Sequence, residues 1–578
     1  MSTIHDKEPA VVVPDDKALS EEEADAQAAA IAVPEDTGEG GKLKMIVSLV
    51  KKCFGVKDIA SMRLSLPASL LEPVPNLEYW HYLDRPDLFA AINDSSESFE
   101  RMLATIRFTL SKDLRHIRGK PVKPYNSVLG EHFRAHWDVP PVSYSSNPSQ
   151  PPILHVHTTN TSSGETLPGP ENHLHASSEV RLSSTPASPV APARKSGFGG
   201  LLSMKGWSTP ALDERTTSPV ESIPSAQFSN LSLASAHTSI STPSSAQHDA
   251  IRIAFLTEQV SHHPPVSAYV ASCPARHITL SGIDQIAAKV TSTASIRVGP
   301  GSFNKGLMVE IGRGAEGETV NGAGERYNIS HPAAHVNGLL RGNPWISMGE
   351  STIVTCEGGE GECLRAVIEY KEESWLGRAQ FAIEGVVHSY TPGEDAVEEW
   401  TKVKHVPRER VLAEVDGSWR GAVRWRKVSL PNASTSRLST ASGSSSAPTG
   451  EWNQLIDLAT LYVVPKTVRP LEKQLPNESR RLWDAVTARL TRKEFGEATK
   501  AKVAIEQKQR DDAAARKSKG VEFVPAYFET DISSGKPTLT EEGRKALEEE
   551  LKDMEAEAKT EAEAPDTPAA TTIEVAAA

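Results

Sequence analysis

The sequence lacks most of the features that identify a secreted, membrane-spanning or zinc-binding protein. It has four cysteines (Cys53, Cys273, Cys356 and Cys363), with no C-x-x-C pair and no zinc-like spacing, a pattern that favours a reducing compartment. No run of about eighteen apolar residues is present, so no segment is expected to span a bilayer. The N-terminus has no apolar signal core. We therefore expect a cytoplasmic protein that associates with membranes only peripherally.

The negative charge is concentrated at the two ends of the chain. The formal net charge is −13, while residues 1–41 carry −9 and residues 531–578 carry −8, so residues 42–530 carry +4. Both ends are predicted to be acidic tails, mobile unless docked. The mildly basic middle fits a protein that visits anionic membrane surfaces, and no nucleic-acid partner is expected.

Composition divides the middle of the chain into folded and unfolded parts. Residues 140–250 are dominated by Ser, Thr, Pro and Ala and are predicted to be a disordered insertion, with residues 432–449 as a second Ser-rich loop. Short alternating segments between them predict strands of one antiparallel sheet, closed into a barrel. The predicted strands include Arg276–Ser281, Leu307–Ile311, Ser351–Thr355, Leu364–Tyr370 and Arg378–Val387. A helical C-terminal part is predicted over residues 451–530, with its helices over 477–520.

Residues 42–54 have the pattern of an amphipathic helix. Apolar side chains recur at i, i+3, i+4 and i+7 spacing, and the polar positions nearby are all lysines. The apolar stripe consists of Leu43, Ile46, Val47, Val50, Cys53 and Phe54, and the lysines are Lys42, Lys44, Lys51 and Lys52. The helix is either packed on the core or serves as a lid, over residues 42–60, that covers an apolar cavity and meets anionic lipid when open.

Two adjacent histidines followed by two prolines form the most unusual motif. The segment Glu258-Gln259-Val260-Ser261-His262-His263-Pro264-Pro265 follows an alternating run that predicts a strand. The prolines stiffen the turn and cannot donate to a sheet, so the histidine rings are held where they can meet an anion. A metal site is a weaker interpretation, because neighbouring strand residues face opposite sides and no third ligand has zinc-like spacing. An acid–base or nucleophilic role for the histidines lacks a partner residue, because no G-x-S-x-G or H-E-x-x-H motif is present.

Two other segments contain polar residues at informative spacing. One is the run from Lys123 to Glu131, which reads Lys-Pro-Tyr-Asn-Ser-Val-Leu-Gly-Glu. In the other, Lys502, Glu506 and Arg510 are spaced i, i+4, i+8 and therefore share one face of a predicted helix. Taken alone, each segment is also compatible with an ordinary solvated surface.

The octapeptide resembles the fingerprint of the oxysterol-binding-protein-related lipid transfer family. The segment 123–131 is similar to the family's Lys-Pro-(aromatic or Leu)-Asn-Pro-x-Leu-Gly-Glu element, with Ser127 in place of the second proline, and all three segments occur in the family's order. Residues 66–73 and 470–480 match as well. The resemblance covers roughly residues 42–530 without the insertion. It implies an α+β fold with a near-complete antiparallel β-barrel enclosing a lipid tunnel, an N-terminal lid helix and a helical C-terminal subdomain, in a short form without pleckstrin-homology or ankyrin domains.

The resemblance also implies a lipid headgroup site. In that family the three segments converge at the tunnel mouth and bind phosphatidylinositol 4-phosphate. Carried over to this sequence, the headgroup ligands are Lys123, Asn126, His262, His263, Lys502 and Arg510, with Glu506 orienting Lys502 and Arg510. A phosphomonoester has up to two negative charges, which cationic and N–H donors can satisfy. No cofactor is expected.

The sequence leaves the second cargo open between sterol and phosphatidylserine. The Leu-Pro-x-x-Leu-Leu-Glu-Pro element at 66–73 is similar to the phosphatidylserine-carrying branch, whereas residues 79–89 look more like short sterol-binding members. Sterol is the primary expectation. We therefore expect a monomeric carrier, not an enzyme, that exchanges sterol for phosphatidylinositol 4-phosphate at endoplasmic reticulum contact sites or at the Golgi or plasma membrane. The alternatives are a phosphatidylserine exchanger, a phosphoinositide-dependent sensor with little transport and, least favoured, a metal-dependent hydrolase.

Overall fold

The structure is a computed structural model of the 578-residue chain. It describes residues 53, 56, 58–59, 71–118, 123–147, 150–156, 159–160, 165–166, 250–292, 295–339, 344–373, 379–428 and 450–552.

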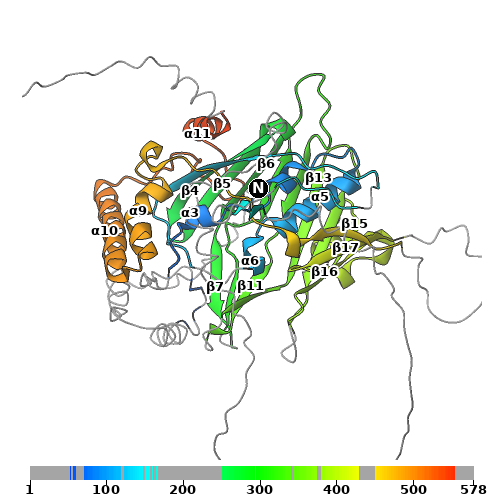
Figure 1. Cartoon of the computed structure of the whole chain (residues 1–578), viewed down its shortest axis with the longest axis horizontal. Helices are drawn as coiled ribbons and strands as arrows, with labels where there is room; N and C mark the ends of the chain where they lie inside the picture. The colour runs from blue at the N-terminus through cyan, green and yellow to red at the C-terminus, as the bar shows by residue number, and fades with distance from the viewer. Residues whose placement is uncertain are drawn as a thin grey trace, which may run out of the picture.

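A single 12-stranded antiparallel sheet forms the centre of the molecule (Figure 1). Its order is β1-β4-β5-β6-β9-β10-β13-β14-β15-β16-β17-β18, so chain neighbours pair along most of it and β1 and β18 are its two edges. The strands are β1 (His132–Val139), β4 (Ile251–His262), β5 (Pro265–Cys273), β6 (Ile278–Asp284), β9 (Leu307–Ile311), β10 (Glu325–Ile329), β13 (Ser351–Gly358), β14 (Leu364–Tyr370), β15 (Ala382–Ser389), β16 (Val411–Ser418), β17 (Ala422–Lys427) and β18 (Asn453–Asp457). This is the α+β architecture built on a near-complete antiparallel barrel that the sequence predicts.

The two faces of the sheet are buried by different parts of the chain. Along β5, Tyr269 and Cys273 belong to the main core, while the alternate residues Ala268 and Val270 pack with Phe528 on the other face. This follows from the two-residue period of a strand. The sheet is thus apolar on both sides in this region, and the side of the main core is the interior of the barrel.

Helices from the N-terminal part cover the interior face. They are α3 (Asn76–Tyr79), α4 (Pro86–Ala90), α5 (Ser98–Ser111) and α6 (Arg115–Arg118). The longest, α5, contacts β13, β14 and β18 and is buried over most of its length. Short α8 (Ala396–Glu399) follows β15.

The C-terminal part contains α9 (Ser479–Thr491), α10 (Phe495–Lys519) and α11 (Glu541–Leu551). Figure 1 shows α9 and α10 side by side at one end of the sheet and α11 near β4, and the contacts agree. The segment before α9 follows the β1 edge, where His136 and Thr467 exchange both backbone hydrogen bonds, at 3.0 and 2.8 Å. This cover protects the edge from other strands.

A smaller antiparallel sheet lies beside the barrel, in the order β12-β11-β8-β7. Its strands are β7 (Ile286–Val290), β8 (Ile296–Pro300), β11 (Ala333–Asn337) and β12 (Trp345–Gly349), and a separate two-stranded ribbon is formed by β2 (Thr159–Asn160) and β3 (Glu165–Thr166). The edge strand β7 holds the chain at Asp58 and Ile59. The Ile59 amide donates to the Ala288 carbonyl at 2.7 Å, and the Ala288 amide donates to Asp58 Oδ1 at 2.8 Å.

Most strand predictions agree with the structure. The predicted strands Leu307–Ile311 and Leu364–Tyr370 coincide with β9 and β14, whereas β6 and β15 each begin and end later than predicted and β13 continues to Gly358. The insertion separates β1 from β4, which are adjacent in the sheet with Val139 opposite Ile251. Most of the insertion, the loop 432–449 and the apolar stripe of the predicted lid except Cys53 lie outside the described residues.

The C-terminal part differs from the sequence prediction at its start. Residues 451–530 are not helical throughout, because residues 453–457 form β18 and the first α-helix of this part begins at Ser479. The acidic tail is predicted to be mobile unless docked, and residues 531–552 are docked, because they include α11, whose Ala546 and Leu547 are buried. The α11 carboxylates explain the docking: Glu550 lies 3.1 Å from Arg469 and 3.2 Å from His136, and Glu549 lies 2.9 Å from Arg134.

Candidate functional site

The adjacent histidines occupy the turn of the β4–β5 hairpin. His262 pairs with Pro265 in the strand register, so His263 and Pro264 form the connection. The two imidazole rings are 4.5 Å apart, at 59° to each other. His263 is exposed and His262 is half-buried, with its Nδ1 atom inside the protein, so the turn presents the His263 ring at the surface.

The segment from Lys123 to Glu131 lies beside this hairpin. The Gly130 amide donates to the Gln259 carbonyl at 3.0 Å, and the Gln259 amide donates to the Glu131 carbonyl at 2.8 Å. This pairing is three residues before His262. At the other end of the segment, the Lys123 ammonium donates to Asn126 Oδ1 at 2.6 Å, and both side chains are exposed.

Glu131 joins the segment to helix α9. Its fully buried carboxylate accepts hydrogen bonds from the Val128 amide at 3.0 Å, the Trp483 indole at 3.0 Å and the Ser479 hydroxyl at 2.7 Å. Burial outweighs these bonds and raises the pKa of Glu131 to about 7. The carboxylate therefore fixes the loop, β1 and α9 relative to one another.

A small apolar core extends this connection to α10. Tyr125 is fully buried with its ring 4.9 Å from that of Trp483, and its hydroxyl lies 3.0 Å from Thr487. Ala498 of α10 is buried in the same cluster, with Ile505 at its margin. The residues just after Lys123 and the first turns of α10 are thus packed together through α9.

This packing places Lys502 near Lys123. Lys502 is 3% exposed and its ammonium donates to Glu506 Oε1 at 2.6 Å. Although the Lys123 side chain as a whole is exposed, the protein atoms around it and then the positive charge of Lys502 lower the pKa of Lys123 to about 8. Two cations held this close at a partly open surface have the electrostatic character of an anion site.

Arg510 lies farther along the same helix. It is exposed, and its Nε and Nη2 donate to Gln507 Oε1 at 3.1 and 2.9 Å. Eight residues of α-helix separate it from Lys502 by about 12 Å. The structure therefore brings Lys123, Asn126, Lys502 and Glu506 together, puts the histidine turn next to their loop, and places Arg510 two helical turns beyond Lys502.

The barrel interior contains a buried polar cluster that sequence analysis did not find. The Tyr82 hydroxyl donates to Asp284 Oδ1 at 2.6 Å, and the Tyr82 ring lies 5.3 Å from that of Tyr269. Burial and the nearby Asp113 raise the pKa of Asp284 to about 7, although the bond from Tyr82 opposes this. The Tyr269 hydroxyl is buried without a protein partner among the described residues. These residues come from distant segments, and no sequence motif connects them.

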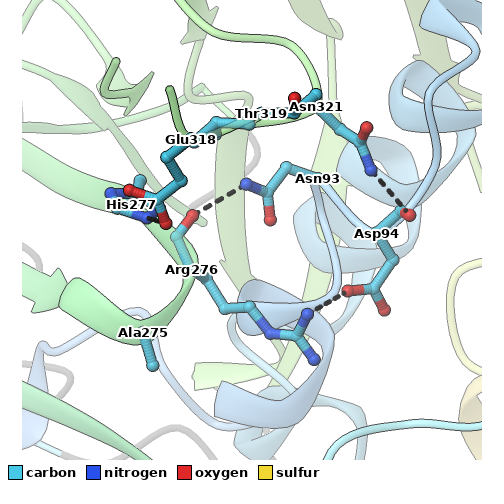
Figure 2. Close-up of a pocket in the computed structure, with 9 residues that line it drawn as sticks. Asn93, Asp94, Ala275, Arg276, His277, Glu318, Thr319 and Asn321 are labelled. Carbon is cyan, nitrogen blue, oxygen red and sulfur yellow. Dashed lines mark hydrogen bonds and ion pairs between the residues drawn. The ribbon is translucent and has the colours of Figure 1, made fainter. Parts of the chain in front are cut away.

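A surface pocket of about 180 Å³ lies at the opposite end of β5 from the histidine turn (Figure 2). The charges around it are already paired within the protein. Arg276 Nη1 lies 3.1 Å from Asp94 Oδ1, and His277 Nε2 lies 2.9 Å from Glu318 Oε1. The Asn93 amide donates to the Arg276 carbonyl at 2.7 Å. With its cations neutralised, this pocket is a poorer phosphate site than the Lys123–Lys502 region.

Within the part of the chain that the structure describes, no group of three His, Cys, Asp or Glu side chains could hold a metal ion. None of the helices described is long and apolar enough to cross a membrane.

Comparison with known proteins identifies the family. The family model of the oxysterol-binding protein matches residues 45–165 and 245–553. The chain belongs to the oxysterol-binding protein family. Oxysterol-binding protein-like protein 1 of Schizosaccharomyces pombe is 38% identical over 516 residues, which are 89% of this chain and 92% of that protein. This match confirms the resemblance inferred from the three motifs. Members of the family are lipid-binding and lipid-transfer proteins.

Other similarities are more distant. Human oxysterol-binding protein-related protein 11 is 25% identical over 468 residues, which are 81% of this chain but 45% of that protein, so this chain spans less than half of that relative. The crystal structure of the Osh1 ORD domain in complex with ergosterol has a TM-score of 0.50 at 17% identity and covers 90% of this chain and 91% of that one. At this identity the similarity shows the fold alone.

Proposed function

We propose that the protein binds a sterol inside the barrel and exchanges it for phosphatidylinositol 4-phosphate between membranes. The observation that carries the headgroup part of this proposal is the closeness of Lys123 and Lys502. Enclosure by the protein, and then the positive charge of Lys502, lower the pKa of Lys123 to about 8, so the two ammonium groups repel each other. A phosphomonoester with up to two negative charges relieves this repulsion and accepts hydrogen bonds from both ammonium groups.

The other headgroup ligands complete the donor set. His262 and His263 provide ring nitrogens at the neighbouring turn, and an imidazole ring gains positive charge readily beside a phosphate. Asn126 is fixed by its bond from Lys123, and Glu506 orients Lys502. Arg510 reaches the phosphate from the next turns of α10, and Glu506 orients it as well when the lipid is bound.

The barrel interior supports a cargo that is apolar except for one hydroxyl. Its core is built from aromatic and aliphatic side chains, with a small polar group formed by Tyr82, Tyr269 and Asp284. A sterol brings one hydroxyl, which can bond to the Tyr269 hydroxyl that has no protein partner among the described residues. The similar Osh1 domain was crystallised with ergosterol, which agrees with this choice.

Exchange follows if both lipids use one cavity. A barrel of this kind holds one lipid-sized ligand, so binding of one cargo displaces the other. A phosphatidylinositol 4-phosphate gradient between membranes can then drive sterol against its own gradient. The predicted lid over residues 42–60 would close this cavity, and the attachment of Asp58 and Ile59 to β7 supplies its fixed end.

One observation favours phosphatidylserine as the second cargo instead. Glu72, in the element that resembles the phosphatidylserine branch, donates its amide to the Lys123 carbonyl at 3.0 Å. The end of the element at Glu72 therefore lies against the headgroup site, where it could help hold a second type of headgroup. In that case substitution of Lys123 or Asn126 weakens both cargoes, whereas a sterol carrier loses only the phosphoinositide.

Lipid extraction from the purified full chain, followed by mass spectrometry, identifies the cargo directly. We expect a sterol and phosphatidylinositol 4-phosphate, and phosphatidylserine in place of the sterol would select the alternative. Transfer between donor and acceptor liposomes then separates a carrier from a sensor that binds lipid but moves little. A protein that binds both lipids and transfers neither would refute the carrier function.

A further inference from the structure

We propose that residues 516–524, the last turn of α10 and the turn after it, dock the protein on an anionic lipid bilayer. We call this segment the docking turn. The proposal rests on the proposed function, because a lipid carrier must bring its headgroup site to a membrane surface. It identifies which surface beside that site meets the membrane and which chemical features of the bilayer it recognises.

The docking turn carries the two most exposed large apolar side chains in the described part of the chain. Val524 is 73% exposed and Val521 is 57% exposed. Single exposed apolar residues are ordinary in proteins, but these two are only three residues apart and belong to one turn. Their exposure in water is unfavourable and is relieved by transfer into the interfacial region of a membrane.

Cations flank these valines. Arg516, Lys517 and Lys519 lie in the last turn of α10, and Glu522 is the only acidic residue among residues 513–528, so this stretch carries +2. Basic residues around exposed apolar side chains match the two layers of an anionic bilayer, phosphate oxygens outside and acyl chains beneath. This charge complementarity points to a lipid surface.

The docking turn is held firmly next to the candidate headgroup site. Gly520 ends α10 with φ of +63°, and the Phe523 ring lies 5.8 Å from the Arg516 guanidinium. Phe523 also packs against Gly130, where an added Cβ would come within 3.3 Å of its ring. Beyond the turn, the Glu258 carboxylate accepts the Ala526 and Tyr527 amides, both at 2.8 Å. Gly130 and Glu258 belong to the two motifs of the headgroup site, so the valines are displayed at its margin.

The apolar contribution is tested with Val521→Ser and Val524→Ser together. The probe is sedimentation of the full chain with vesicles of phosphatidylcholine and phosphatidylserine that contain no phosphatidylinositol 4-phosphate. We expect about a tenfold loss of vesicle affinity, from partial burial of two valine side chains. The matched control is Leu471→Ser with Leu475→Ser, which removes apolar side chains that are 39% and 45% exposed outside the docking turn. This control should bind vesicles like the wild type.

The charge contribution is tested with Lys517→Gln and Lys519→Gln together. At low salt we expect about a 25-fold loss, from roughly fivefold for each lysine near an anionic surface, and a weaker dependence of binding on salt. Lys402→Gln with Lys404→Gln is the control, because these lysines are also exposed and two residues apart. Wild-type vesicle binding by both docking-turn variants, or an equal loss in the controls, would overturn the proposal and leave the turn as a site for a protein partner.

A soluble headgroup separates this proposal from the proposed function. Inositol 1,4-bisphosphate carries the phosphate chemistry without a bilayer, so both docking-turn variants should bind it like the wild type. The variant with His262→Ala and His263→Ala should lose the soluble headgroup and keep its affinity for phosphatidylserine vesicles. Loss of the soluble headgroup in the docking-turn variants would contradict a membrane role, whereas its retention in the histidine variant would contradict only the headgroup site.

Discussion

Replacement of Lys502 by methionine tests the electrostatics of the candidate headgroup site. Lys502 is 3% exposed, and methionine preserves most of its apolar contacts while removing the charge. The variant loses one charge-assisted bond to the phosphate, worth about 1.5–3 kcal/mol. We therefore expect the affinity for phosphatidylinositol 4-phosphate to fall by about 10- to 150-fold.

The same substitution should change the titration of Lys123. Enclosure and the charge of Lys502 lower the pKa of Lys123 from 10.5 to about 8, so in the wild type the affinity should decline as pH rises through about 8. Without Lys502 the pKa of Lys123 rises, and this decline moves to higher pH. The folded wild type also binds fewer protons than the unfolded chain between pH 8 and 10.5, so Lys123 makes stability increase with pH there. The variant should show less of this increase.

Isothermal titration with a short-chain phosphatidylinositol 4-phosphate at several pH values measures both effects. Lys508→Met is the control, because Lys508 is on the same helix with its side chain 78% exposed and 2.7 Å from Asp512. Glu506 loses its bond from Lys502 in the variant, so Lys502→Met combined with Glu506→Gln separates the lost cation from the remaining carboxylate. Affinity and pH profile equal to those of the wild type would refute the paired-cation site.

Three other perturbations test the histidine turn, the loop and the lid. His262→Ala with His263→Ala should weaken phosphatidylinositol 4-phosphate extraction at least about a hundredfold, by two lost bonds, at an unchanged melting temperature; wild-type extraction would contradict the assignment. Glu131→Ala should lower the free energy of unfolding by about 3 kcal/mol or more, because three buried donors lose their acceptor. Because the folded pKa of Glu131 is raised to about 7, it makes wild-type stability decrease as pH rises from about 4.5 to 7, and Glu131→Gln should remove that contribution; an unaltered pH profile in denaturant melts would argue against it. Deletion of residues 42–54 should leave the sheet folded by circular dichroism while cargo retention falls and vesicle adhesion rises, and a globally unfolded product would show that this segment is core instead.

Local patterns predicted the parts of the fold that depend on local sequence. β9 and β14 are predicted with their observed bounds, because β9 alternates between buried and half-buried residues and β14 is bounded by turns. The turn at the two histidines is predicted because the two prolines that follow stiffen the backbone and cannot donate to a sheet. Helices α9 and α10 follow from their helix-forming composition.

Features that depend on distant partners could not be predicted. Most residues of α5 are buried, including the charged Arg101 and Arg107, and only distant partners such as Glu325, which pairs with Arg101, explain this burial. Helix α11 is strongly acidic and has the composition of a tail. Its docking depends on the three-dimensional positions of Arg134 and Arg469 and on the apolar cluster that buries Ala546 and Leu547. The interior cluster joins Tyr82, Tyr269 and Asp284, which no spacing connects.

The candidate site was predicted as a set of residues but not as a geometry. The sequence places Lys502, Glu506 and Arg510 on one helix face, which the structure keeps, yet Arg510 donates to Gln507. The role of Glu131 was not predicted, because its three bonds come from a loop and a helix about 350 residues apart in sequence. The only indication of this role in the sequence is the position of Glu131 at the end of the Leu-Gly-Glu element.

The central claim is that two lipids compete for one cavity. Native mass spectrometry of the full chain, loaded with labelled sterol and then titrated with phosphatidylinositol 4-phosphate, counts the lipids bound to each protein molecule. We expect only singly loaded protein, with sterol replaced one for one as the phosphoinositide is added. A saturable species that holds one molecule of each lipid would contradict the exchange mechanism.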